Sequence, residues 1–144
     1  MKIYVAGASA ERAVVGRYIA KLREAGAEIT FDWVAPIEAD GGVANEGLSP
    51  ERSQELAQAA LDGVEAAEVV WILVPKTASI GAWIEMGSAL TLRRRRALSS
   101  DGTSGLPRIF VSGAYQRTIF SSLTCEVYDR DEDAYSAIVE MVQR

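Results

Sequence analysis

Short apolar runs alternate with longer amphipathic segments along the chain. The run 69–74 reads Val-Val-Trp-Ile-Leu-Val and is followed by Pro75, which is typical of a strand buried on both faces of a sheet. Between residues 10 and 24, apolar side chains recur at helical spacing, and Gly26 just beyond them marks a helix end. The same patterns predict strands at 2–6, 28–33, 69–74, 108–111 and 126–128, and helices at 10–24, 50–67, 81–96, 117–123 and 131–142.

This alternation predicts an α/β fold, a Rossmann-like parallel sheet of about five strands with helices on both faces. The length of 144 residues suits one domain over 1–144. Ligands bind at the carboxyl ends of the strands in open parallel sheets, so the expected binding loops are 7–13, 32–49, 75–81 and 112–121. The segment 35–49 is rich in glycine and is expected to be a loop.

The amino-acid composition removes several kinds of chemistry. The chain contains no histidine, which excludes Ser-His-Asp and Cys-His catalysis as well as histidine metal ligands. Its single cysteine, Cys125, excludes an internal disulfide and a multi-thiolate zinc site. Acid–base chemistry must therefore come from carboxylates, or less often from tyrosine, lysine or water. No metal or organic cofactor is implied.

The overall charge does not favour binding to a nucleic-acid polymer, because the formal net charge is −5 and such binding needs a basic surface. Residues 93–96 are four arginines, which form either a solvated helix end or a nucleic-acid patch; we favour the helix end. No apolar run is long enough to cross a membrane, and the first residues do not resemble a secretion signal. We expect a cytoplasmic protein without a membrane partner.

Residues 75–89 contain two features that are costly in a helix. Glu85 shares a helix face with Gly81 and Ala89 at four-residue spacing, so a carboxylate is expected on a small apolar face close to the sheet. Such a group is costly unless a cleft solvates it or a partner binds it. Gly87 costs about 1 kcal/mol relative to alanine. Either these residues mark a functional site, or Glu85 points to water and Gly87 only permits packing.

Two segments carry a resemblance to a known family: Ile3-Tyr4-Val5-Ala6-Gly7, and Ser79-x-Gly81-x-x-x-Glu85-x-Gly87-x-Ala89 after a buried strand. They resemble the nucleoside 2-deoxyribosyltransferase family, and more closely its nucleoside 5'-monophosphate N-glycosidase members. The resemblance runs from the first strand to the last helix. It implies a flavodoxin-like fold, a homodimer or larger homo-oligomer, and a nucleoside or nucleotide as the small-molecule partner.

The resemblance also implies a covalent mechanism in which Glu85 attacks the anomeric carbon of the sugar. A glutamate with a reference pKa of about 4.3 is ionised at neutral pH and needs no histidine to activate it. A glycosyl-enzyme intermediate is the logic of retaining glycosidases. On the resemblance, Tyr4 orients Glu85; the alternative is a tyrosine of the core.

The departing base needs a proton donor, and the sequence offers two carboxylates. The family has an aspartate on the helix before the central strand; Asp62 lies on that helix, about half a turn from the matching position. Asp32 lies near the end of the second predicted strand, beside Trp33. Each has a simpler interpretation: Asp62 as an exposed helix residue, and Asp32 as a hydrogen-bonding residue at the start of a loop.

Ser79 bears on the choice between hydrolase and transferase. On the resemblance, deoxyribosyltransferases carry an acid here, near the sugar 5'-hydroxyl, whereas the monophosphate hydrolases carry a serine. An acid repels a 5'-phosphate, whereas a hydroxyl donates to it, and the backbone amides of the helix start around Gly81 add further donors. The alternative is that Ser79 is simply the N-cap of this helix.

The first loop, Gly7-Ala8-Ser9-Ala10-Glu11-Arg12, offers further phosphate candidates. Gly7 permits close approach of a ligand to the backbone, and Ser9 or Arg12 has the chemistry to bind an anion. The alternatives are an ordinary turn and a solvated arginine. The family's hydrolases have a serine directly after the glycine, where this chain has Ala8.

Residues 117–122, Arg-Thr-Ile-Phe-Ser-Ser, resemble the segment that family members lend to the site of a neighbouring subunit. Ser121 or Ser122 is then expected to contact the ligand across a dimer interface. Without the resemblance, this segment is a capped short helix.

Several functions remain open. We favour hydrolysis of the N-glycosidic bond of a (deoxy)nucleoside 5'-monophosphate through a glycosyl-Glu85 intermediate. The alternatives are a transferase that moves deoxyribose between bases and a non-catalytic nucleotide sensor on the same fold. A flavodoxin-like redox module is disfavoured, because the first loop lacks a run of hydroxyl residues for a flavin phosphate.

Overall fold

The fold is a five-stranded parallel sheet with the strand order β2-β1-β3-β4-β5. The computed structural model describes residues 1–41, 47–99, 105–113, 118–124 and 126–144. The strands are β1 (Lys2–Ala6), β2 (Glu28–Ile29), β3 (Val69–Leu73), β4 (Arg108–Ser112) and β5 (Glu126–Tyr128). This order is that of flavodoxin-like folds, so the predicted fold class is confirmed.

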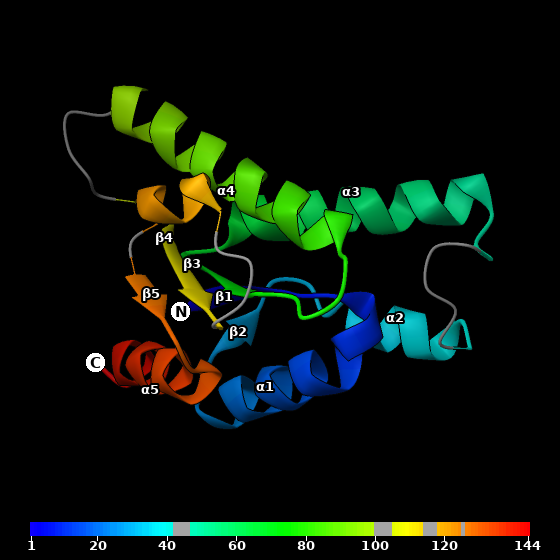
Figure 1. Ribbon diagram of the computed structural model, residues 1–144, viewed down its shortest axis with the longest axis horizontal. Coiled ribbons are helices and arrows are strands. Elements are labelled where there is room, and N and C mark those ends of the chain that lie inside the picture. Colours follow the sequence, from blue (N-terminus) through cyan, green and yellow to red (C-terminus); the bar gives the residue numbers. More distant parts are fainter. Residues whose placement is uncertain (42–46, 100–104, 114–117, 125) are drawn as a thin grey trace.

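Helices cover both faces of the sheet (Figure 1). One face carries α3 (Pro50–Ala66) and α4 (Ile80–Ser99), and the other carries α1 (Arg12–Glu24) and α5 (Asp131–Val142). The short helix α2 (Val34–Ala39) contacts α1. Short 3₁₀ helices span Ser9–Glu11 and Ile119–Leu123. No helix among the described residues is long and apolar enough to span a membrane.

The central strand β3 organises the core, because all five of its residues are buried. Its Val70 pairs with Tyr4 of β1 on one side and with Ile109 of β4 on the other. The ring of Trp71 packs edge-on against Tyr18 of α1, with 4.9 Å between ring centroids. Trp71 is therefore a core residue, as the sequence predicts.

A buried polar chain ties α5 to the sheet. The indole nitrogen of Trp71 donates to Oγ of Ser112 over 2.9 Å, and that hydroxyl donates to Oδ1 of Asp131 over 2.6 Å. Among the described residues, no buried side-chain nitrogen or oxygen lacks a hydrogen-bond partner. The fold therefore does not leave these polar groups to a ligand.

The second strand and the segment after it differ from the prediction. The strand is limited to Glu28–Ile29, and a helix, α2, forms where a loop was expected. Oδ1 of Asp32 accepts hydrogen bonds from the backbone amides of Val34 and Ala35, which satisfies two amides that a helix start otherwise leaves free. Pro36 lies in the first turn of α2, where proline is tolerated.

Two of the four arginines at residues 93–96 donate hydrogen bonds to neighbouring backbone. Arg93 donates to the carbonyl of Pro107 over 2.8 Å, and Arg96 donates to the carbonyls of Gly105 and Glu65, each over 3.2 Å. The other two arginines are exposed. Half of the run thus fastens the end of α4 to neighbouring backbone.

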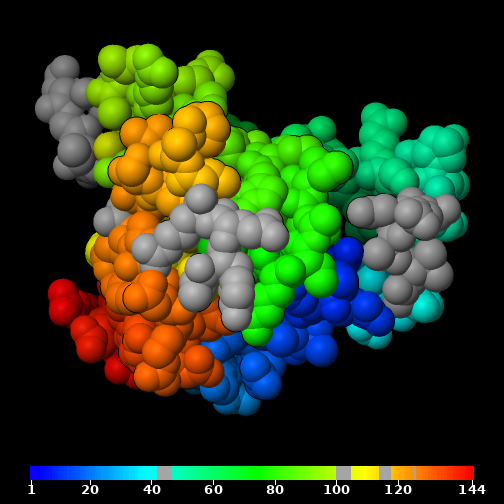
Figure 2. All heavy atoms as spheres, in the orientation of Figure 1, coloured from blue at the N-terminus to red at the C-terminus, as the bar shows by residue number. Residues whose placement is uncertain are grey.

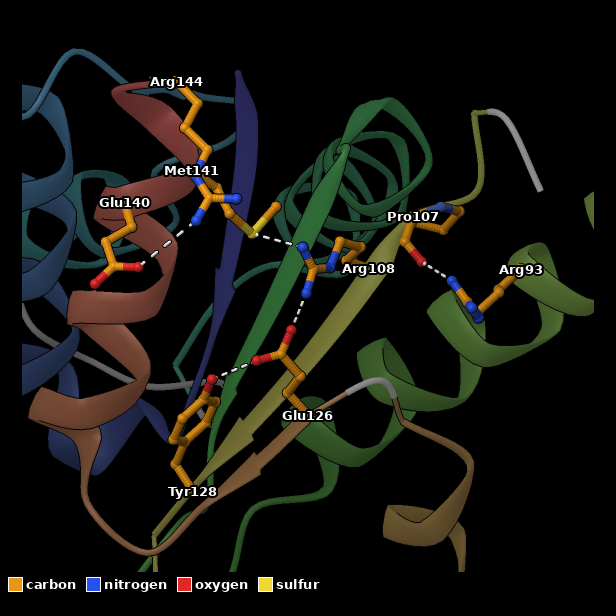
Figure 3. A network of polar contacts seen from close by, with 8 residues as sticks. All are labelled: Arg93, Pro107, Arg108, Glu126, Tyr128, Glu140, Met141 and Arg144. Carbon is orange, nitrogen blue, oxygen red and sulfur yellow. Dashed lines mark hydrogen bonds and ion pairs between the residues drawn. The ribbon is translucent and has the colours of Figure 1, made fainter.

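The outer edge of the sheet is held by polar side chains (Figure 3). Arg108 forms an ion pair with Glu126 across β4 and β5, and it also donates to Sδ of Met141 on α5. The hydroxyl of Tyr128 donates to the same carboxylate. These contacts join β4, β5 and α5 at the edge of the sheet opposite β2.

Candidate active site

Tyr4 and Glu85 meet on the face of the sheet that α3 and α4 cover. Tyr4 is fully buried in β1, and its hydroxyl donates to Oε1 of Glu85 over 2.6 Å. Glu85 lies in the second turn of α4 and keeps part of its surface exposed. The two residues are 81 positions apart in the chain. The structure therefore brings together the pair that the family resemblance implies.

The electrostatic setting of Glu85 differs from that of an ordinary surface glutamate. Burial raises the pKa of its carboxyl group to about 7, although the hydrogen bond from Tyr4 acts in the opposite direction. Burial first, and then the nearby Glu85, raise the pKa of the Tyr4 hydroxyl well above its usual value. Tyr4 thus stays protonated as a donor. Glu85 is a mixture of acid and carboxylate near pH 7, whereas the reference pKa predicts full ionisation.

A glycine in α3 permits the close packing around Tyr4. A Cβ atom on Gly63 would lie 2.8 Å from Cβ of Phe31, which is closer than real Cβ contacts come, and 3.0 Å from Cδ2 of Tyr4, which is tighter than most of them. Gly63 is not among the site residues that the sequence predicts. The available signal was a glycine inside a predicted helix, which costs about 1 kcal/mol and so often has a packing reason.

Gly87 is the opposite case. It is exposed in α4, and a Cβ atom there would meet nothing within 4 Å. The idea that Gly87 permits packing is therefore not supported by its surroundings among the described residues.

The two candidate proton donors do not approach Glu85 through any hydrogen bond of the described residues. Asp62 is exposed on α3 and accepts a hydrogen bond from Gln58 over 2.8 Å. Asp32 pairs with Arg23 over 2.8 Å in addition to capping α2. For both residues the simpler interpretation describes their observed contacts.

The first loop is used mainly for packing and internal ion pairing. A Cβ atom on Gly7 would lie 2.6 Å from Cγ2 of Val15, so this glycine lets α1 approach the sheet. The guanidinium of Arg12 forms an ion pair with Glu38 and also lies 3.4 Å from the carbonyl oxygen of Ser9. The Ser9 residue itself is partly exposed.

The loop between β3 and α4 is held by Glu11, which is not among the site residues that the sequence predicts. Its Oε1 accepts hydrogen bonds from the backbone amides of Lys76 and Thr77, over 2.8 and 3.0 Å, and lies 3.3 Å from the hydroxyl of Thr77. Ser79 follows in a partly exposed position just before α4, and Gly81 is exposed in its first turn. No local sequence pattern links Glu11 to a loop 65 residues away.

The serines near the carboxyl end have local partners. Thr118 and Ser121 form a capping box at the start of the 3₁₀ helix Ile119–Leu123, and Ser122 donates to the carbonyl of Ile119 over 2.7 Å. Ser121 is buried and Ser122 is exposed. The capped short helix is thus present, whereas Arg117 lies outside the described residues.

An apolar hollow of about 830 Å³ separates this 3₁₀ helix from α4. Its lining includes Trp83, Met86, Leu90, Ile119, Phe120 and Leu123. Figure 2 shows both segments side by side on one face of the molecule. Ile119 is 83% exposed, Phe120 is 52% exposed and Leu123 is 62% exposed, and these neighbours on one short helix form an exposed apolar surface beside the hollow. Among the described residues, no group of acidic or cysteine side chains is arranged to hold a metal ion.

The two helical glycines give a matched test of the packing around Tyr4. Gly63→Ala is expected to lower the free energy of unfolding by roughly 1–3 kcal/mol, because the added methyl group overpacks the contact with Tyr4 and Phe31. Gly87→Ala is expected to raise it by about 1 kcal/mol, because alanine is the better helix former and the space is open. Urea unfolding of both variants measures the difference; equal effects would contradict this account of Gly63.

Comparison with known proteins supports the fold. No protein-family model matches the sequence, and no curated protein matches it either. Among solved structures, the chain is similar to the CMP N-glycosidase BcmB of Clostridium botulinum, with a TM-score of 0.55 and 15% identity. The match covers 96% of this chain and 98% of that one. The two proteins therefore share the whole α/β fold.

Proposed function

We propose that the chain belongs to the nucleoside 2-deoxyribosyltransferase family and cleaves the N-glycosidic bond of a (deoxy)nucleoside or its 5'-monophosphate. The observation that carries the proposal is the hydrogen bond from the buried Tyr4 to Glu85, whose pKa burial raises to about 7. A partly exposed carboxylate, fixed by a buried donor, suits a nucleophile. The fold shared with a CMP N-glycosidase is consistent with this chemistry.

In the first step, a carboxylate oxygen of Glu85 attacks the anomeric carbon of the sugar. The bond from that carbon to the base nitrogen breaks, and its electron pair leaves with the base. The result is a glycosyl ester on Glu85. Tyr4 donates to the same carboxylate, so it fixes the direction of the attacking oxygen and disfavours other rotamers.

In the second step, water attacks the anomeric carbon of the ester, the bond from that carbon to the Glu85 oxygen breaks, and Glu85 leaves as a carboxylate. The attacking water loses one proton to solvent, which balances the proton that the base took up in the first step. The sugar product keeps its configuration because the carbon is inverted twice. A free base in place of water would give transfer instead of hydrolysis. In this proposal Ser79, which precedes the helix that carries Glu85, lies near the sugar 5' end, as the family resemblance implies.

The departing base must also gain a proton. Asp62 is the group that the family resemblance points to, but its carboxylate is exposed and bound to Gln58. We assign this proton to solvent, which reaches the partly exposed side of Glu85.

We further propose that the protein forms a homodimer through the apolar hollow between α4 and the 3₁₀ helix. A second copy of the same face would bury Phe120 and Ile119, which are exposed in the single chain. Glu85 lies in α4 directly before Met86, one of the lining residues. Such an interface would therefore form beside the proposed site.

Glu85→Gln and Glu85→Ala are expected to lower kcat by a factor on the order of 10³ or more, because the attacking group is lost. The measurement is chromatographic detection of free base from a panel of nucleosides and 5'-monophosphates, with and without an added acceptor base. Glu65→Ala, which changes an exposed glutamate on the neighbouring helix, is the control and should keep wild-type activity. Unchanged base release by Glu85→Gln would remove Glu85 from the mechanism; tight nucleotide binding without turnover would indicate a sensor.

The pH dependence follows from the raised pKa of Glu85. The nucleophile is the carboxylate, so kcat/KM is expected to rise with pH through a midpoint near 7. In Tyr4→Phe the hydrogen bond that lowers this pKa is lost, and the midpoint should move to higher pH. A pH–rate profile of both proteins, together with carbon NMR titration of the Glu85 carboxyl group, measures the shift. A midpoint near 4.5 in the wild type would contradict the assigned environment of Glu85.

The dimer is tested by placing a charge in the hollow. Phe120→Asp is expected to give a monomer where the wild type gives a dimer, because an apolar interface tolerates a buried unpaired carboxylate poorly. Leu61→Asp is the control, since Leu61 is exposed on α3 outside this hollow. Size-exclusion chromatography with light scattering reports the mass. A monomeric wild type would rule out the proposed interface.

A further inference from the structure

Glu11 places a negative charge where a substrate phosphate would be expected. The loop between β3 and α4 offers three donors close together: two backbone amides and the hydroxyl of Thr77. All three face Oε1 of Glu11, at distances from 2.8 to 3.3 Å. Clustered amides with a hydroxyl are typical phosphate ligands. Thr77 is two residues before Ser79, which the proposed function assigns to the 5' end of the sugar.

The surroundings of Glu11 also carry more negative than positive charge. A crevice of about 240 Å³ runs along the carboxyl ends of β1, β3 and β4. Its charged lining residues are Glu11, Lys76, Asp129, Arg130, Asp131 and Glu132, four carboxylates against two cations. A phosphate dianion in this crevice would meet a net negative charge.

The arginine of the first loop already has an ion-pair partner. Arg12 forms its ion pair with Glu38 of α2, and the residue after Gly7 is Ala8, which has no side-chain donor. Among the phosphate candidates of the first loop, Arg12 is thus occupied internally and Gly7 contributes only its backbone, whereas Ser9 still offers a partly exposed hydroxyl. The hydroxyl of Ser79 also favours the binding of a phosphate, whereas the contacts of Glu11 and Arg12 disfavour it.

We propose that Glu11 is a specificity-determining residue that selects for nucleosides and against nucleoside 5'-monophosphates. This inference rests on the proposed function and names its substrate class. The carboxylate occupies the donors of the β3–α4 loop, so a phosphate binds there only by displacing it. Displacement leaves a carboxylate beside a dianion, and like charges at such distances repel each other. A neutral 5'-hydroxyl meets neither cost.

The test uses the full chain and two changes at one position. Glu11→Gln keeps the size of the side chain and a carbonyl oxygen that accepts from the amides, but it removes the charge. Glu11→Ala removes both. Glu24→Gln is the matched control, because it makes the same charge change at the far, exposed end of α1. Far-UV circular dichroism and thermal unfolding verify that each variant is folded.

The first measurement is calorimetric titration with inorganic phosphate, which needs no turnover. Glu11→Gln and Glu11→Ala are expected to bind phosphate about tenfold more tightly than the wild type, because a neutral acceptor competes less well for the amides. Glu24→Gln should match the wild type. Affinities for phosphate within twofold of the wild type in both Glu11 variants would overturn the proposal.

The second measurement compares substrates. In the wild type, a nucleoside should have the higher kcat/KM, and in Glu11→Gln the ratio of monophosphate to nucleoside should rise about tenfold. A wild type that binds a 5'-monophosphate more tightly than its nucleoside would also overturn the proposal, with no variant required. If no substrate is turned over, the proposed N-glycosidase activity fails, whereas the phosphate titration still decides the role of Glu11.

Discussion

The contact between Tyr4 and Glu85 couples the sheet to the helices that cover it, and it requires the burial of a carboxyl group, which has an energetic cost. The carboxyl group has a pKa of about 7 in the folded chain and near 4.5 in the unfolded chain. Between these two pH values, the folded chain holds a proton that the unfolded chain has already released. The folded state is therefore favoured at the acid end, and this contribution to stability is lost as pH rises from about 4.5 to about 7. A leucine at this position would avoid the cost. A sequence that retains a destabilising carboxylate beside a buried tyrosine is most simply explained by function.

Two glycines make this arrangement possible by letting helices approach β1 from opposite sides. Gly7 follows the strand and leaves room for Val15 of α1, and Gly63 leaves room for Tyr4 beneath α3. Each would collide with a neighbour if it carried a side chain. β1 is thus packed closely on both faces, which fixes the direction of the Tyr4 side chain. The Tyr4 hydroxyl lies near Glu85 because the backbones of α3 and β1 approach each other closely at Gly63, and not only because of its hydrogen bond.

The sequence was sufficient for the parts of the fold that depend on hydrophobic periodicity. The run at 69–74 predicted the central strand because a strand buried on both faces is apolar throughout. It was insufficient for α2, because that helix depends on the capping of two amides by Asp32. At the site, spacing alone left open whether Glu85 pointed to water, and only the family resemblance paired it with Tyr4. Gly63 and Glu11 were missed because their importance depends on which elements pack together, which periodicity does not specify.

A pKa near 7 is a compromise for a carboxylate nucleophile. A more basic carboxylate attacks more readily, but a smaller fraction of it is ionised at neutral pH, and the product of the two factors is largest when pKa and pH are similar. In the proposed mechanism, the same basicity would make the carboxylate a poorer leaving group when water hydrolyses the glycosyl ester. The hydrogen bond from Tyr4 opposes this effect, because it stabilises the carboxylate as it departs. Burial and the tyrosine therefore act in opposite directions on the pKa of Glu85, and the two steps of the proposed reaction would need both effects.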